Sequence, residues 1–182
     1  MKMQGICRLN WACGNWTPAG WINSDQKDQA GVDLVCDIRD GFPLDHGSVD
    51  IIACIHTLPE FAYDALVPTL EELHRVLKPN GTLRIAVPDL DVSIRAYLRG
   101  DTEHFQIPDW ETRSLGAKFA RYLTWYGYTR SVFTYDYLEE MLFKARFRHV
   151  VRCAFKETPS GYPEIVDLDN RETESLFVEA MK

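Results

Sequence analysis

Five short apolar runs lie within the first ninety residues, and they constrain the fold more than any other feature of the sequence. The runs are ICRLNWA, GWINS, VDLVCD, VDIIACI and TLRIAV. Each has the length and β-branched content of a strand buried on both faces, although periodicity alone does not exclude a short helix. Such strands are typical of sheets covered by helices on both faces, so the sequence predicts a mostly parallel sheet.

A helix between the fourth and fifth runs is predicted by the spacing of four leucines. Leu66, Leu70, Leu73 and Leu77 step by four, three and four residues and therefore share one helical face. The KPNG sequence that follows consists of residues common in turns, and we expect it to end the helix.

The connection between the first two runs is unusually short. Gly14 after one apolar run and Asp25 at the end of the next form the skeleton of a dinucleotide-type site, but they lie much closer together than the roughly 20 residues that are usual. Residues 14–20 could form an antiparallel hairpin that turns at TPAG. They could also return extended to a parallel strand, because seven residues span roughly 23 to 25 Å.

The pattern changes between Asp91 and Tyr135, where aromatic residues are dense and strand signals are weak. Spacing places Leu115, Phe119, Tyr122 and Tyr126 on one helical face, so most of these rings are expected in a core. A further helix is predicted behind Thr134 as N-cap, with Leu138, Met141, Leu142 and Ala145 on its apolar face. Two last strands, FRHVVRCAF and SLFVEA, are joined by a polar loop and can lie antiparallel.

Composition indicates one globular domain over residues 1–182 and excludes several classes of partner. The net charge of −7 argues against nucleic-acid and anionic membrane surfaces. No secretory h-region or membrane-spanning run is present, so we expect a soluble, cytoplasmic protein. The five cysteines include no CxxC pair; we expect reduced, packing cysteines and no metal site.

The segments LNWACGNWTPAGWINSD, VDLVCDIRDGFPLDHGSVDIIACIHTL and LEELHRVLKPNGTLRIAVPDLD resemble a known family. They are similar to class I S-adenosylmethionine-dependent methyltransferases, in particular to the small predicted enzymes of the methyltransferase type 11 group. The resemblance covers nearly the whole chain. It implies a single-domain, Rossmann-like α/β fold of about seven strands, mostly parallel with one antiparallel strand. It also implies that the helix after the glycine loop is missing, which favours the extended return over the hairpin.

The resemblance implies that S-adenosylmethionine is the cofactor and assigns residues to it. Asn10, Ala12, Cys13 and Gly14 match the loop under the methionine part, where Ala12 replaces a glycine common in the family. Asp25 matches the carboxylate that accepts hydrogen bonds from the ribose hydroxyls. Asp37 and Ile38 match the pair beside the adenine.

Residues on the acceptor side are less clearly marked. His56 lies in IHTLPEF, where Pro59 and Glu60 depart from the Glu and His usual in the family; it either caps the strand end or contacts cofactor or acceptor. Asp89 is either a base or a group that positions the acceptor, or else it is an N-cap for the next helix. Residues 91–135 are expected to form a helical insertion on the acceptor side. Within it, Trp125, Tyr126 and Tyr128 are candidates for acceptor contact.

The reaction implied is methyl transfer to an unidentified acceptor, expected to be a small molecule or saccharide. Alignment matters most, and a general base is needed only for a protonated acceptor, so no particular catalytic side chain is required. Two alternatives stay open. One is a non-catalytic module that binds S-adenosylmethionine or S-adenosylhomocysteine. The other is a nicotinamide-dependent oxidoreductase, disfavoured because GxGxxG is absent. A homodimer is also possible.

Overall fold

The computed structural model describes residues 5–182, and its centre is one seven-stranded sheet with the order β3-β2-β1-β4-β5-β7-β6. The strands are β1 (Arg8–Trp11), β2 (Ile22–Asp25), β3 (Leu34–Val35), β4 (Val49–Ile55), β5 (Leu77–Pro88), β6 (Arg148–Cys153) and β7 (Ser175–Met181). Only β7 runs antiparallel to its neighbours, β5 and β6, within the described chain. The predicted sheet, mostly parallel with one antiparallel strand, is confirmed.

Four α-helices and five 3₁₀ helices complete the described chain. The α-helices are α1 (Tyr63–Val76), α2 (Leu90–Arg99), α3 (Leu115–Thr124) and α4 (Tyr135–Lys144). The 3₁₀ helices are η1 (Ile38–Asp40), η2 (Leu58–Glu60), η3 (Glu103–Phe105), η4 (Trp125–Gly127) and η5 (Pro163–Val166). No helix in residues 5–182 has both the length and the apolar character needed to cross a membrane.

The short connection between β1 and β2 returns without a helix, and the two strands pair in parallel. Leu9 lies opposite Ile22, and Trp11 lies opposite Ser24. The extended return is therefore confirmed, and the hairpin is excluded. Thr17 packs closely against Gly31, where an added Cβ would lie 2.4 Å from the Thr17 hydroxyl oxygen. The compact connection thus rests directly on the loop that follows β2.

The crossover helix α1 is present, but it ends one residue earlier than predicted. Val76 is its last residue, and Leu77 already has extended backbone angles and pairs with Val49 of β4. The KPNG sequence lies within β5, and Asn80 there has a φ of 64°. An additional Cβ on Gly81 would come within 2.9 Å of the backbone oxygens of Asp50 and Lys78. The turn residues therefore shape an irregular start to the strand.

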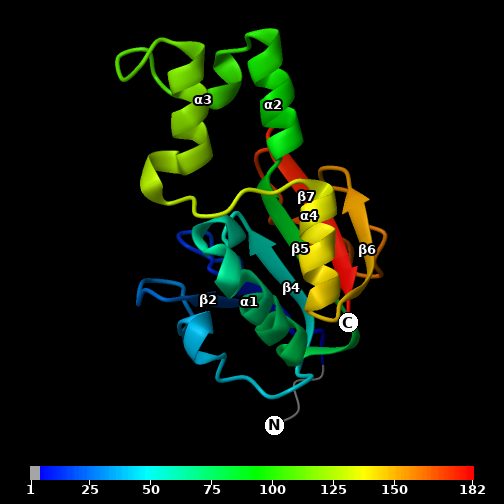
Figure 1. The fold of residues 1–182 in the computed structure, drawn as a ribbon. Helices are drawn as coiled ribbons and strands as arrows, with labels where there is room; N and C mark the ends of the chain where they lie inside the picture. The colour runs from blue at the N-terminus through cyan, green and yellow to red at the C-terminus, as the bar shows by residue number, and fades with distance from the viewer. Residues whose placement is uncertain (1–4) are drawn as a thin grey trace.

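The two faces of the sheet are covered by different kinds of structure. Side chains of Ile52 and Cys54 belong to the main core, which includes the apolar residues of α1 and α4. These two helices lie side by side over that face (Figure 1). The alternate residues Ile51 and Ala53 instead pack with Trp21 and with Ile165, Val166 and Leu168 around η5. The loop between β6 and β7 therefore covers part of the face where the chain has no helix after β1.

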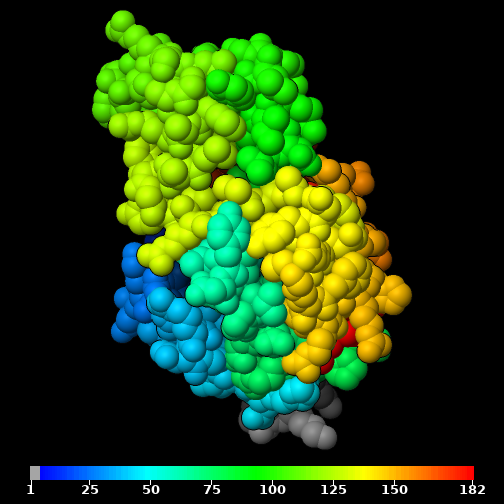
Figure 2. All heavy atoms as spheres, viewed as in Figure 1, coloured from blue at the N-terminus to red at the C-terminus, as the bar shows by residue number. Residues whose placement is uncertain are grey.

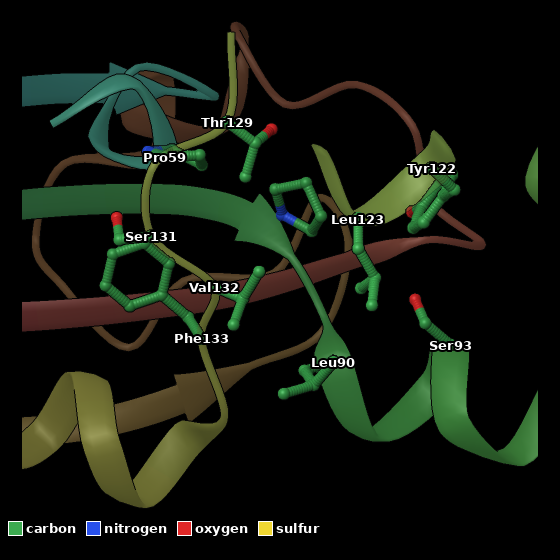
Figure 3. A pocket seen from close by; sticks show the side chains of 10 residues that line it. Pro59, Leu90, Ser93, Tyr122, Leu123, Thr129, Ser131, Val132 and Phe133 are labelled. Atoms are coloured by element: carbon green, nitrogen blue, oxygen red, sulfur yellow. The ribbon is translucent and has the colours of Figure 1, made fainter. Parts of the chain in front are cut away.

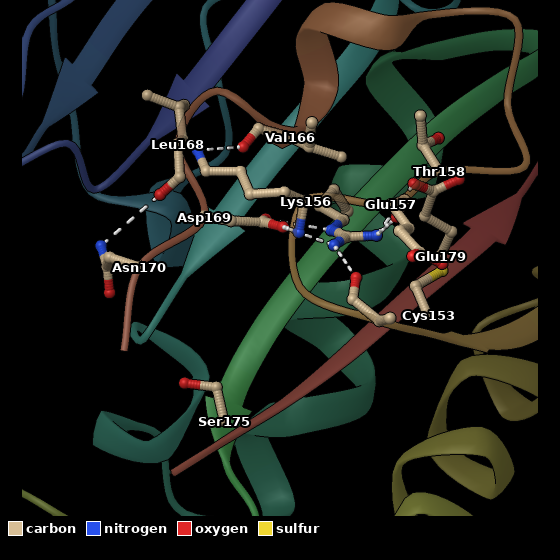
Figure 4. Close-up of polar contacts among 12 residues, drawn as sticks. Cys153, Lys156, Glu157, Thr158, Val166, Leu168, Asp169, Asn170, Ser175 and Glu179 are labelled. Carbon is tan, nitrogen blue, oxygen red and sulfur yellow. Dashed lines mark hydrogen bonds and ion pairs between the residues drawn. The ribbon is translucent and has the colours of Figure 1, made fainter. Parts of the chain in front are cut away.

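A buried arginine holds this covering loop to the sheet. Arg84 of β5 has no exposed surface, and its guanidinium contacts Asp169 at 2.5 Å and Glu179 at 3.1 Å. It also donates hydrogen bonds to the backbone oxygens of Ala154 and Glu157 (Figure 4). The loop, the middle of β5 and β7 thus share one buried polar network.

Helices α2 and α3 stand beyond the ends of the strands and away from the sheet (Figure 1). Ala96, Phe105, Ile107 and Tyr122 form a small core of their own. Phe119 and Trp125 pack against this core, and Phe133 is buried in the main core, whereas Tyr97, Trp110, Tyr126 and Tyr128 are exposed. The expectation that most of these rings lie in a core is met only in part. One expectation is wrong: α3 ends at Thr124, so Tyr126 does not share its helical face. Thr134 does precede α4 at the N-cap position.

Candidate cofactor-binding site

A cavity of about 570 Å³ opens at the carboxyl ends of β1, β2 and β3. In open α/β sheets, ligands bind at this edge of the strands. Its walls come from the loops after these strands, from the start of α1 and from the segment before α4. The lining residues are Trp11, Ala12, Gly14, Asn15, Asp25, Gln26, Lys27, Gln29, Cys36, Asp37, Ile38, Arg39, Thr57, Glu60, Phe61, Ala62, Ala65, Gly127, Tyr128 and Arg130. We call this space the large cavity.

Asp25 and Gly14 meet in the large cavity. One carboxylate oxygen of Asp25 accepts a hydrogen bond from the Gly14 backbone N–H at 2.9 Å, and the other accepts one from the Lys27 N–H at 2.9 Å. A carboxylate offers about four acceptor positions, so Asp25 retains capacity for ligand hydroxyl groups. Gln29 fixes the loop further by donating to the Gly14 carbonyl at 2.5 Å.

Asp37 and Ile38 lie on the neighbouring wall, after β3. Asp37 accepts hydrogen bonds from the backbone and side chain of Arg39, and this pairing lowers the pKa of the Asp37 carboxyl group. The carboxylate is therefore charged at neutral pH and is an acceptor. Ile38 is buried and provides an apolar surface beside it.

Sequence reasoning missed the aromatic part of the large cavity. Trp11 and Phe61 lie with ring centroids 5.7 Å apart, and both line the cavity. Phe61 comes from the LPEF segment that departs from the family pattern, immediately after η2. The ring of Phe61, next to Pro59 and Glu60 in the sequence, could have indicated this wall, because planar ligands stack on aromatic rings. Together with Ile38, Phe61 and Ala65 give the cavity an apolar wall.

Three other residues assigned to the cofactor loop have different positions. Ala12 lines the large cavity in a left-handed conformation, with φ of 53°. Asn10 is buried behind the loop and donates to the Trp16 carbonyl and to Asn23 Oδ1. Cys13 is buried and its N–H donates to the Ser24 carbonyl. Asn10 and Cys13 thus shape the loop, whereas Ala12 faces the space.

His56 is not brought to the large cavity. It follows β4 with φ of 59°, and its Nε2 lies 3.4 Å from the Ser175 hydroxyl of β7. Its Nδ1 is buried with no hydrogen-bond partner among residues 5–182. Burial lowers the pKa of His56 to about 4, and the nearby charge of Arg171 acts in the same direction. The imidazole is therefore neutral at physiological pH.

Asp89 is used within the fold. One oxygen caps α2 by accepting from the N–H groups of Asp91 and Val92, and the other pairs with Arg152 at 2.6 Å. The carboxylate is 1% exposed. Of the roles that the sequence left open for Asp89, the structure shows the N-cap of α2.

The segment from Gly127 to Phe133 crosses the edge of the large cavity, and we call it the strap. In Figure 2 its yellow-green start lies against the blue N-terminal region and the teal segment after β4. It is fixed to the turn after β4, because the N–H groups of Arg130 and Ser131 donate to the Pro59 carbonyl at 2.7 and 3.2 Å. Tyr128 and Arg130 line the large cavity.

Of the three aromatic candidates for acceptor contact, only Tyr128 lines the large cavity. Trp125 packs edge-on against Tyr122, with ring centroids 6.3 Å apart. Tyr126 donates a hydrogen bond to Glu111 and is 52% exposed. No cluster of His, Cys, Asp and Glu suited to a metal ion occurs within residues 5–182, and the five cysteines are free.

Comparison with known proteins agrees with this geometry. Residues 19–85 match a family model described as a methyltransferase domain, of the methyltransferase 11 family. A search of curated proteins found no significant match. The family's cofactor is S-adenosylmethionine. A cavity with a carboxylate after β2, a second after β3 and an apolar wall fits the ribose and adenine of such a molecule.

Several solved structures share the fold over nearly the whole chain. A methyltransferase from Thermotoga maritima, described as a possible histamine N-methyltransferase, has a TM-score of 0.60 at 18% identity, covering 97% of this chain and 82% of its own. A methyltransferase from Archaeoglobus fulgidus has a TM-score of 0.58 at 12% identity, and the match covers 98% of this chain and 87% of that one. A methyltransferase from Mesorhizobium loti has a TM-score of 0.58 at 14% identity, and the match covers 98% of this chain and 91% of that one. Residues 19–85 are thus similar to the methyltransferase 11 family, and the described chain has the fold of these S-adenosylmethionine-dependent methyltransferases.

Proposed function

We propose that the protein transfers a methyl group from S-adenosylmethionine to a small-molecule or saccharide acceptor, with the cofactor in the large cavity. The observation that carries this proposal is the convergence of Gly14, Asp25, Asp37 and Ile38 on one space of about 570 Å³. This volume lies within the range of cofactor sites. The four residues come from three separate loops, so their meeting is a property of the fold.

Each wall of the cavity would hold a different part of the cofactor. Asp25 accepts from the ribose hydroxyl groups, and Asp37 accepts from the exocyclic amine of the adenine. Ile38 and Phe61 pack against the ring, while the backbone around Ala12 and Gly14 lies beside the methionine part. When bound, the cofactor supplies an activated methyl group on a sulfonium. The chain therefore has to align the acceptor and exclude water.

The acceptor would enter beside the strap, with the helical insertion of residues 91–135 above it. Tyr128 at the cavity rim provides an aromatic surface there. Asp89 and His56 both have partners within the fold, and neither of them lines the large cavity. An acceptor proton would then leave to water or to a group of the acceptor itself, which suits an acceptor that is a good nucleophile without a general base.

The second candidate function is a non-catalytic module that binds the cofactor or its product. The commitment of Asp89 to Arg152 and α2 favours it, because no free base is left at that strand end. Two measurements separate the candidates. Calorimetric titration with S-adenosylhomocysteine should show binding in both cases, and absence of binding at millimolar ligand would reject both. Transfer of a labelled methyl group to metabolite and saccharide pools is expected only of the enzyme.

A further inference from the structure

A second, smaller pocket lies on the other side of the strap from the large cavity. Thr129 and Ser131 line this pocket, whereas Tyr128 and Arg130 line the large cavity. Pro59 lines the small pocket and its neighbour Glu60 lines the large one. The two spaces are thus separated by a single thickness of chain, the strap and the turn after β4.

The small pocket, which we call the pit, is mainly apolar. Figure 3 shows side chains from the strap, from α2 and from α3 around it. Its lining residues are Pro59, Pro88, Leu90, Ser93, Tyr122, Leu123, Thr129, Ser131, Val132 and Phe133. None of them is charged. The pit has a volume of about 20 Å³, roughly room for one small group, because about 10 to 15 Å³ is needed to hold a water molecule.

Two hydroxyl groups give the pit its polar character. Tyr122 and Ser93 are 7% and 1% exposed and come from different helices, α3 and α2. Ser93 Oγ donates to the Asp89 carbonyl at 3.0 Å and lies 3.4 Å from His104 Nε2. Burial raises the pKa of the Tyr122 hydroxyl, so it remains protonated at neutral pH.

A buried carboxylate stands behind the pit. Tyr122 donates to Glu174 Oε2 at 3.2 Å, and Gln106 donates to the same oxygen at 3.2 Å. Glu174 is 6% exposed, and Arg171 lies 3.5 Å from its other oxygen. A second anion placed in the pit would face this carboxylate across the Tyr122 hydroxyl, in surroundings of low dielectric where repulsion between like charges is strong.

We propose, resting on the function proposed above, that the pit binds one small, uncharged end of the methyl acceptor, an alkyl or hydroxymethyl group, and rejects an anionic one. The apolar walls bind the carbon atoms, and the hydroxyl groups of Tyr122 and Ser93 are placed to bind one neutral polar atom. The bound end of the acceptor then lies on the Thr129 side of the strap, and the nucleophilic end extends over the strap to the Tyr128 side, where the large cavity opens. Acceptor specificity then depends on residues that do not line the large cavity.

The test compares two molecules with the same branched carbon skeleton, isobutanol and isobutyrate. Each is titrated into the protein with and without saturating S-adenosylhomocysteine, and binding is followed by NMR shifts of the amide signals of Leu123 and Val132. Isobutanol should bind at least about tenfold more tightly than isobutyrate. Equal affinities, or no shift with isobutanol, would overturn the inference.

A filling substitution provides the matched control. Leu123→Trp places a larger side chain at the pit and should abolish the isobutanol shifts. Leu98→Trp makes the same change on α2, at a residue that is 77% exposed, and should leave them intact. Both variants should bind S-adenosylhomocysteine within about twofold of the wild type. Isobutanol binding that persists in Leu123→Trp would also overturn the inference. Failure of S-adenosylhomocysteine to bind the wild type would instead reject the proposed function, and the titrations without it would still decide the inference.

Discussion

Asp25 at the end of β2 accepts a hydrogen bond of 2.9 Å from the backbone N–H of Gly14, across the loop that joins β1 to β2. The same carboxylate accepts from the Lys27 N–H. The parallel pairing of β1 and β2 brings these groups together, because it places both carboxyl ends at one edge of the sheet. One side chain therefore shapes the loop and faces the large cavity at the same time.

Replacing Asp25 should weaken cofactor binding strongly. Hydrogen bonds to a charged group contribute about 1.5 to 3 kcal/mol, so Asp25→Ala should reduce the affinity for S-adenosylhomocysteine roughly 10- to 150-fold. Isothermal titration calorimetry measures this directly. Asp25→Asn, which keeps one acceptor oxygen, should lose less of this affinity than Asp25→Ala.

The control for this substitution is Asp40→Ala, which removes an exposed carboxylate that does not line the large cavity. It should change the affinity less than twofold. A loss under twofold in Asp25→Ala, with the circular dichroism spectrum unchanged, would remove Asp25 from the site.

Ala12→Gly should stabilise the protein, contrary to the usual effect of adding glycine. Ala12 has a φ of 53°, and a left-handed conformation costs roughly 1 to 2 kcal/mol in a residue with a Cβ. Glycine also has more conformational freedom in the unfolded chain, and this offsets about 0.4 to 1 kcal/mol of the gain from relieving the strain. Urea denaturation should therefore show a gain of about 0.5 to 1 kcal/mol in the free energy of unfolding.

The comparison is Ala120→Gly on the exposed side of α3, which should lower the free energy of unfolding by about 0.5 to 1 kcal/mol. The prediction is that the free energy of unfolding rises in Ala12→Gly and falls in Ala120→Gly. If both substitutions destabilise the protein equally, the positive φ of Ala12 does not strain the backbone.

The sequence predicted the sheet well, because strands buried on both faces consist of continuous runs of apolar and β-branched residues. The resemblance to the methyltransferases implied cofactor roles for Gly14, Asp25, Asp37 and Ile38, and the structure brings these four residues to one cavity. The pattern alone indicated only Gly14 and Asp25, at a spacing shorter than usual. The assignments to the cofactor remain predictions until binding is measured.

The parts that sequence reasoning missed depend on contacts between distant segments. Nothing near Asp89 in the sequence indicates Arg152, which pairs with it 63 residues later. Leu77 continues the helical spacing of α1 but belongs to β5, because pairing with Val49 outweighs the local pattern. The role of Arg84 is equally hidden, since a lone arginine in an apolar run does not reveal its partners.

His56 should make stability depend on pH in a specific window. Its pKa is about 4 in the folded protein against about 6.5 unfolded, so the unfolded state binds more protons between these values. Stability from this residue is therefore fully present above about pH 6.5 and is lost as the pH falls toward 4. Between pH 7 and pH 5 the loss should be about 2 kcal/mol. His74, whose pKa burial also lowers, adds a slope of the same sign.

His56→Asn isolates this contribution, because asparagine tolerates the positive φ at this position. Urea denaturation at pH 7 and pH 5 should show that the variant loses about 2 kcal/mol less than the wild type. His149→Asn is the control: His149 also has positive φ, 49°, but is exposed. Its pH dependence should match that of the wild type. An unchanged slope in His56→Asn would mean that the imidazole is solvated.

The buried network around Arg84 should dominate the stability of the loop that covers the second face of the sheet. Arg84→Ala leaves Asp169 and Glu179 buried without their cation, and burial already raises the pKa of Glu179. Removing one partner of a buried ion pair costs about 3 to 5 kcal/mol, so urea denaturation should show a loss of this size. Arg95→Ala, on the exposed side of α2, should stay within about 0.5 kcal/mol of the wild type.

Local and global effects of this substitution can be separated. Lys156 donates its backbone N–H to Asp169 at 3.0 Å, so its amide exchange reports on the loop, whereas the amide of Ile52 in β4 reports on the sheet. Arg84→Lys keeps the charge but loses the paired geometry of the guanidinium. It should speed exchange at Lys156 far more than at Ile52. Equal acceleration at both amides would mean that the network stabilises the whole domain and has no particular role in holding the loop.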